Sequence, residues 1–151
     1  MRFFNLSETD LPKPIRASFI LNVEMDELFI QAGLQDRVIQ VYEGLVYMDF
    51  DRGLFERQGH GEYIPLDDVK LPQFFLAYSP NPSDSGRIHS NVKQRWLAGD
   101  EDIVEGMKHF SLIVDQARVA LEQSNWKLLK ELMTANFEQR RKLYTGLYIS
   151  I

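Results

Sequence analysis

An aspartate behind a glycine is the first residue of this sequence whose setting suggests chemistry. Asp36 stands in the string "GLQDRV" (33–38), three residues after Gly33 and directly before Arg37. A carboxylate in this position has two interpretations. It is either the cap of a helix that begins behind the glycine, or a general base that orients a hydroxyl group and takes its proton. The residues alone leave both open.

A second group of polar residues lies in "SPNPSDSGRIHS" (79–90), where Ser83, Ser85 and Arg87 come just before or at the start of an expected helix. Hydroxyl groups, a guanidinium and the positive end of a helix together suit an anion. The alternative is a capping loop, in which Asp84 or Ser85 satisfies the first N–H groups of that helix.

Several classes of site do not fit the sequence. The chain has no cysteine, and its three histidines are scattered without zinc-ligand spacing. Its nine glycines stand apart, with only Gly59 and Gly61 close together. A loop that cradles nucleotide phosphates needs several small residues in succession, so that backbone N–H groups can approach. No such loop is present in the 151 residues.

Composition excludes further partners. The formal net charge is −5, and no basic cluster exceeds "RRK" (140–142), so we expect neither nucleic acid nor a membrane as partner. No apolar run has the length of a signal peptide or a membrane span, so we expect a cytoplasmic protein.

Periodicity and turn residues predict an α+β chain with the strands in its first half. Expected there are a helix over about 13–30, opened by Ser7, Asp10 and two prolines and stopped by Gly33, and a short helix after Asp36. Strands are expected over 44–51, over 63–67 with Pro65 at a sheet edge, and, as a buried strand, over 73–79; loops are expected over 52–62 and 80–86.

The second half is predicted to be helical. Helices are expected over 87–99, over 100–123 with Asp100 as its cap, and over about 125–144. The short link 123–125 predicts an antiparallel helical hairpin. A domain boundary is expected near 68–72.

Three strings in order resemble the glucuronokinases, which belong to the GHMP sugar-kinase superfamily. They are "AGLQDRVIQVYEGLVYMDFD" (32–51), "YSPNPSDSGRIHSNVKQRWLAGDEDI" (78–103) and "LKELMTANFEQRRKLY" (129–144). The resemblance runs from about residue 10 to residue 145.

This resemblance implies a transferase that phosphorylates a carbohydrate alcohol group, a sugar 1-kinase. It would pass the γ-phosphoryl group of ATP, with Mg²⁺, to the anomeric hydroxyl of D-glucuronate, a small-molecule sugar acid. The superfamily's catalytic aspartate matches Asp36. Residue type, rather than a family motif, suggests Arg37, Ser83, Ser85 and Arg87 as substrate-binding residues, because glucuronate carries its own carboxylate. Galacturonate and arabinose are alternative substrates.

The sequence also departs from the superfamily. The ATP-binding motif P-x-x-x-G-L-x-S-S-A and the later "GSGGA"-like loop are absent, and Glu43 stands where relatives often have glycine. We therefore expect no cofactor-binding or metal-binding residue in this chain, and a truncated isoform or central fragment that is inactive alone. It would keep the end of a ribosomal-S5-like N-terminal domain (1–69) and the beginning of a ferredoxin-like C-terminal domain (70–151). Unpaired strand edges and apolar faces would then favour self-association or pairing with a full-length subunit, and a non-catalytic interaction or substrate-binding role is the alternative.

Overall fold

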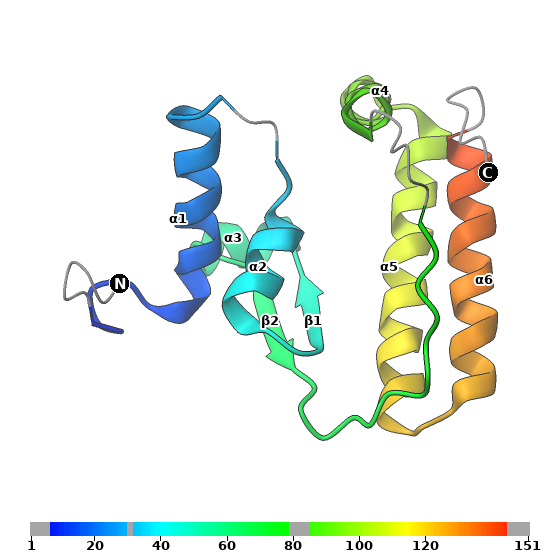
Figure 1. The fold of residues 1–151 in the computed structure, drawn as a ribbon. Helices are drawn as coiled ribbons and strands as arrows, with labels where there is room; N and C mark the ends of the chain where they lie inside the picture. Colours follow the sequence, from blue (N-terminus) through cyan, green and yellow to red (C-terminus); the bar gives the residue numbers. More distant parts are fainter. Residues whose placement is uncertain (1–6, 30–31, 79–84, 145–151) are drawn as a thin grey trace. The chain divides into compact units, whose positions relative to one another are not determined.

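The computed structural model describes residues 7–29, 32–78 and 85–144, with the side chains of 85–90 excepted. The chain is α+β, as predicted, and divides into two compact units, Met1–Val69 and Lys70–Ile151. Figure 1 shows the two-stranded sheet in the first unit, and a helical hairpin in the second.

The first unit is built from short elements. In chain order they are α1 (Lys13–Asp26), α2 (Leu34–Tyr42), β1 (Val46–Asp49), α3 (Arg52–Gln58) and β2 (Glu62–Pro65).

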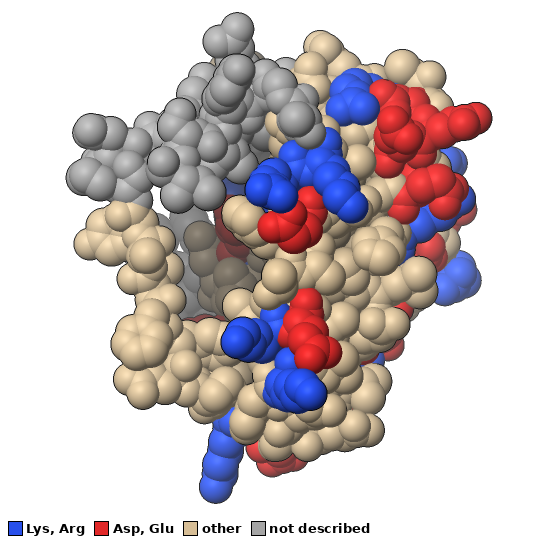
Figure 2. Space-filling view, turned by 90° about the vertical axis from the view of Figure 1, so that its right-hand side faces the viewer, with Lys and Arg blue, Asp and Glu red and all other residues tan. Residues whose placement is uncertain are grey.

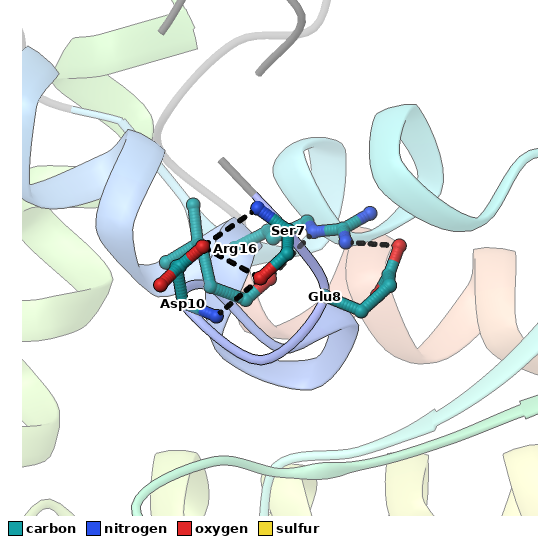
Figure 3. Close-up of polar contacts among 5 residues, drawn as sticks. Ser7, Glu8, Asp10 and Arg16 are labelled. Carbon is teal, nitrogen blue, oxygen red and sulfur yellow. Dashed lines mark hydrogen bonds and ion pairs between the residues drawn. The ribbon is translucent and has the colours of Figure 1, made fainter. Parts of the chain in front are cut away.

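The predicted start of α1 is correct in position, but its polar residues lie one turn earlier. The backbone N–H and the hydroxyl of Ser7 donate to Asp10 Oδ2 at 2.8 and 2.6 Å, and the Asp10 N–H donates to Ser7 Oγ at 3.2 Å (Figure 3). These bonds close a turn, and they lower the pKa of the Asp10 carboxyl. The helix itself begins at Lys13, with Pro12 in the cap position.

Arg16 ties this turn to the helix. Its Nε donates to the Leu11 carbonyl at 3.0 Å, and its guanidinium pairs with Glu8 (Figure 3). The pairing lowers the pKa of the Glu8 carboxyl.

The predicted end of α1 is wrong. The helix stops at Asp26 instead of continuing to residue 30, and Gly33, predicted as its stop, is the residue that caps α2. The apolar pair Leu28 and Phe29 misled the prediction. Both side chains are exposed, and Phe29 has a positive φ of 56°. Their spacing continues the helical pattern, but the two exposed side chains add no packing that would stabilise a longer helix.

The core of the first unit is small. Ala17 of α1, Val38 of α2 and Tyr63 of β2 are buried together. The remaining members pack around them from the same elements and β1: Leu34, Val41, Tyr42, Val46 and Met48. Alanine at position 17 lets α2 approach α1 closely, because its side chain is a single methyl group.

Strands β1 and β2 form an antiparallel hairpin in which Val46 faces Pro65 and Asp49 faces Glu62. Both strands were predicted, but the loop expected over 52–62 is largely helix α3. Asp51 caps α3 through a hydrogen bond from the Leu54 N–H at 3.2 Å.

The second unit consists of α4 (Ser85–Leu97), α5 (Glu101–Glu122) and α6 (Trp126–Leu143), so the predicted helices are confirmed. Helices α5 and α6 lie side by side as an antiparallel hairpin, as predicted (Figure 1). Asp100 caps α5 through the Ile103 N–H at 3.3 Å, and Asn125 caps α6 through the Leu128 N–H at 3.1 Å.

The buried strand predicted over 73–79 is wrong over the described residues 73–78, which form neither helix nor strand. The side chains of Phe75 and Leu76 are each 89% exposed, and that of Tyr78 is 84% exposed. An apolar run becomes a strand only when a neighbouring strand pairs with its backbone, and the described residues supply none here. The loop predicted over 80–86 falls outside the described residues as far as 84, and Ser85 and Gly86 are already helical.

Candidate functional site

Asp36 lies in the first turn of α2, where its side chain is 75% exposed. The capping interpretation is wrong, because Gly33 holds the cap position of α2 and no side chain caps this helix. The carboxylate is therefore at the positive end of a helix, yet it makes no capping hydrogen bond there. This leaves its oxygens accessible to a ligand.

The local sequence explains this exposure. Val38 is fully buried against α1, and Asp36 precedes it by two positions. Two residues correspond to about 200° around a helix, so burying Val38 turns Asp36 toward solvent.

Arg37 has the opposite environment, with its side chain only 14% exposed. Its Nη2 pairs with the Glu24 carboxylate of α1, whose side chain is 22% exposed. Its Nη1 donates to the Gly33 carbonyl at 3.4 Å and lies 3.6 Å from Asp36 Oδ2. One guanidinium thus touches α1, the cap of α2 and the exposed aspartate.

Sequence reasoning missed Glu24, although a signal for it existed. Glu24 follows the buried Ala17 by seven residues, and two helical turns place both on the same face of α1. An acidic residue on the packed face of a helix implies a cationic partner on the helix that covers that face. The partner became identifiable only once α2 was known to pack there.

The aromatic residues beside α2 stay neutral. Burial raises the pKa of the Tyr42 and Tyr63 hydroxyls, and the two rings meet edge to face at 5.5 Å between centroids. A neutral phenol is a poor base, so neither tyrosine competes with Asp36 for proton transfer.

The other predicted site residues belong to the second unit. Ser83 lies outside the described residues. Ser85 is the first residue of α4 and Arg87 is in its first turn, but their side chains are outside the described set. The structure therefore brings Asp36 and Arg37 together, and the roles of Ser83, Ser85 and Arg87 remain predictions.

A pocket of about 640 Å³ lies among α4, α5 and α6. Two of the basic side chains that line it are paired with acids: Arg95 Nε bonds Asp100 Oδ2 at 2.8 Å, and Lys108 Nζ bonds Glu105 Oε1 at 2.6 Å. Figure 2 likewise shows acidic and basic side chains interspersed on the face in view. This mixture lacks the single sign of charge that would draw an anionic sugar or nucleotide.

Two kinds of feature are absent from the described part of the chain. No three His, Asp or Glu side chains there converge in a way that would hold a metal ion. Nor does that part contain a helix with the length and apolar character needed to cross a membrane.

Comparison with known proteins gives two relatives from Arabidopsis thaliana. The chain is 48% identical to Glucuronokinase 1 over 130 residues, which are 86% of this chain and 36% of that protein. It is 44% identical to Probable glucuronokinase 2 over 143 residues, which are 94% of this chain and 38% of that protein. No protein-family model matches the chain, and neither does any solved structure.

The chain thus spans a little over a third of the length of both relatives. Identity at this level over almost the whole chain exceeds what a shared fold class alone would produce. Over this stretch, the sequence is similar to those of the two glucuronokinases.

Proposed function

We propose that these residues supply the sugar side of a sugar-acid 1-kinase of the glucuronokinase type, with ATP and D-glucuronate as substrates and glucuronate 1-phosphate as product. The observation that carries the proposal is 48% identity to Glucuronokinase 1 over 86% of the chain. We also assign the chain to the GHMP superfamily with its two-domain fold. This assignment rests on the three sequence strings at 32–51, 78–103 and 129–144.

Asp36 is the residue assigned to the chemistry. Phosphoryl transfer depends mainly on positioning and on charge neutralisation, and needs little covalent work from the protein. An exposed carboxylate within hydrogen-bond reach of the anomeric hydroxyl orients that hydroxyl and accepts its proton as the new P–O bond forms. Its 75% exposure leaves room for the sugar beside it.

ATP is assigned to residues outside this chain. The 151 residues contain no glycine-rich phosphate loop, and the described part offers no cluster for a metal ion. When bound, Mg²⁺ would neutralise charge on the transferred phosphoryl group. The role of these residues is then to hold the sugar acid and its hydroxyl, and the isolated chain is expected to bind glucuronate without turnover.

A chimaera tests the proposal directly. The matching segment of Arabidopsis Glucuronokinase 1 is replaced by that of this chain, and ADP release is measured with glucuronate, galacturonate and arabinose. Glucuronate-dependent ADP release supports the proposal. Faster release with galacturonate or arabinose would show that the substrate is that sugar instead. A soluble, folded chimaera without activity on any of them would contradict it.

A second candidate function is binding without catalysis, either of the sugar acid or of another subunit. Its support is that the apolar side chains of Phe75 and Leu76 are exposed. The chimaera separates the two functions, because the isolated chain is expected to be inactive under both. Glucuronate-dependent ADP release by the chimaera would exclude a purely non-catalytic role, and ADP formed by the 151-residue chain alone would exclude it as well.

A further inference from the structure

The Glu24–Arg37 pair has a geometry that a substrate ligand would not need. Both terminal nitrogens of Arg37 are committed to protein groups: Nη2 to Glu24, and Nη1 to the Gly33 carbonyl and toward Asp36. An arginine that receives a substrate carboxylate presents its two nitrogens side by side to that carboxylate. Here that edge already faces Glu24 and the start of α2.

The orientation of the guanidinium is also costly. Arg37 Nε is buried and has no hydrogen-bond partner among the described residues. Buried unpaired donors are uncommon, and each lowers stability. In this orientation Arg37 leaves Nε without a hydrogen bond, while Nη1 and Nη2 contact Glu24, the Gly33 carbonyl and Asp36.

The fixed position of Arg37 restricts the side chain of Asp36. Alone, an aspartate that is 75% exposed would exchange freely among its side-chain rotamers. Arg37 Nη1, at 3.6 Å from Asp36 Oδ2, favours the rotamer in which the carboxylate lies toward the guanidinium. Arg37 can hold this position because Glu24 fixes it from α1.

We propose that Glu24 and Arg37 are positioning residues for Asp36, with Glu24 anchoring the guanidinium that holds the Asp36 carboxylate in one orientation. This inference rests on the proposed function of Asp36. It also moves Arg37 from the substrate ligands to the support of the catalytic carboxylate. The carboxylate of the sugar acid must then meet a cation other than Arg37.

The reach of the two groups explains why lysine would not serve. Arg37 contacts Glu24 and Asp36 at once through two nitrogens of a rigid planar group. Lysine offers one flexible ammonium, which would pair with the less exposed Glu24 and leave Asp36. Arg37→Lys should therefore keep α1 against α2 and release Asp36.

The test measures the side-chain rotamer of Asp36 by NMR in the full 151-residue chain. Three-bond couplings from the backbone nitrogen and carbonyl carbon to the Asp36 carboxyl carbon report its χ1 populations. We expect one dominant rotamer in the wild type and averaged couplings in Glu24→Gln and Arg37→Lys. The matched control is Glu27→Gln, which removes the same charge from an exposed residue just after α1.

Amide spectra of each variant show whether the chain still folds. If Glu24→Gln does not fold, Arg37→Lys tests the same proposal. Unchanged Asp36 couplings in folded Glu24→Gln or Arg37→Lys would overturn the proposal, as would averaged couplings in the wild type. The measurement does not depend on kinase activity. An inactive chimaera would overturn the proposed function and leave the NMR result unaffected. Unchanged Asp36 couplings would overturn the positioning role and leave an active chimaera unaffected.

Discussion

At the scale of single residues, the proposed function depends on Asp36. An exposed carboxylate in the first turn of a helix contributes about 0.3–1 kcal/mol to stability through the helix dipole. General base catalysis is worth about 10²–10⁴ in rate, or roughly 3–5 kcal/mol of barrier at 1.36 kcal/mol per tenfold. The two roles therefore predict different outcomes for one substitution.

Asp36→Asn in the chimaera should lower kcat by about 10²–10⁴ and leave the melting temperature almost unchanged, because the side chain is exposed and caps nothing. Steady-state kinetics with glucuronate and thermal unfolding measure the two effects. Asp26→Asn, at the last residue of α1, is the control and should keep wild-type turnover. Wild-type kcat in Asp36→Asn would remove this residue from the mechanism.

Asp100 gives a prediction for pH. Its pKa is lowered, chiefly by the hydrogen bond from Arg95 at 2.8 Å, so the folded state favours the ionised carboxylate. The contribution to stability is fully present above the ordinary pKa of an aspartate, and it disappears as pH falls through the lowered value.

Asp100→Asn removes the charge but keeps a good helix cap. Chemical unfolding of the full chain should therefore show a stability gap between wild type and variant at pH 7 that closes as pH falls through the lowered pKa of the Asp100 carboxyl. Asp102→Asn, an exposed residue of the same first turn, should show a smaller gap. A gap for Asp100→Asn that stays constant with pH would contradict the role of the ion pair.

At the scale of elements, the sequence predicts best where local signals and packing agree. Helices α5 and α6 combine apolar spacing with caps at Asp100 and Asn125, and both were predicted to within a residue or two. Helix α3 was missed although Asp51 and Gly59 bracket it, because seven residues give too little periodicity to recognise.

The failures share one physical cause, which is dependence on a partner. The apolar run over 73–78 has strand composition, but a strand exists only when another strand pairs with it. The site shows the same dependence. The exposure of Asp36 follows from the burial of Val38 within the same helix. The Glu24–Arg37 pair cannot be predicted without knowing that α1 packs on α2.

The hairpin of the first unit depends on a close approach at Gly61. A Cβ atom there would collide with the backbone carbonyl of Asp49 and with the Tyr63 ring, neither of which can easily move. Gly61→Ala should lower the free energy of unfolding by about 1–3 kcal/mol, measured by urea titration. Gly33→Ala is the control, since nothing lies within 4 Å of its added methyl group; it only exchanges a good helix N-cap residue for a poor one, so its effect should stay below about 1 kcal/mol. Equal effects of the two substitutions would contradict this packing.

At the scale of the whole molecule, the exposed apolar side chains predict association. Phe75 and Leu76 are each 89% exposed, and contiguous apolar surface of this kind favours contact between copies. Phe75→Asp should reduce the concentration-dependent increase in sedimentation coefficient without lowering the melting temperature, because the ring is not part of a core. Gln73→Asp introduces the same charge in the same segment and serves as the control. Association that is unaffected by Phe75→Asp would place the contact elsewhere.

We propose that these residues form the sugar side of a kinase that phosphorylates the anomeric hydroxyl of glucuronate. The most direct measurement is ³¹P NMR of the chimaera's product, made from ATP, Mg²⁺ and ¹³C-labelled glucuronate. The account predicts a phosphate coupled to C1 of the sugar acid. A phosphate on another carbon, or inorganic phosphate as the only product from a folded chimaera, would contradict it.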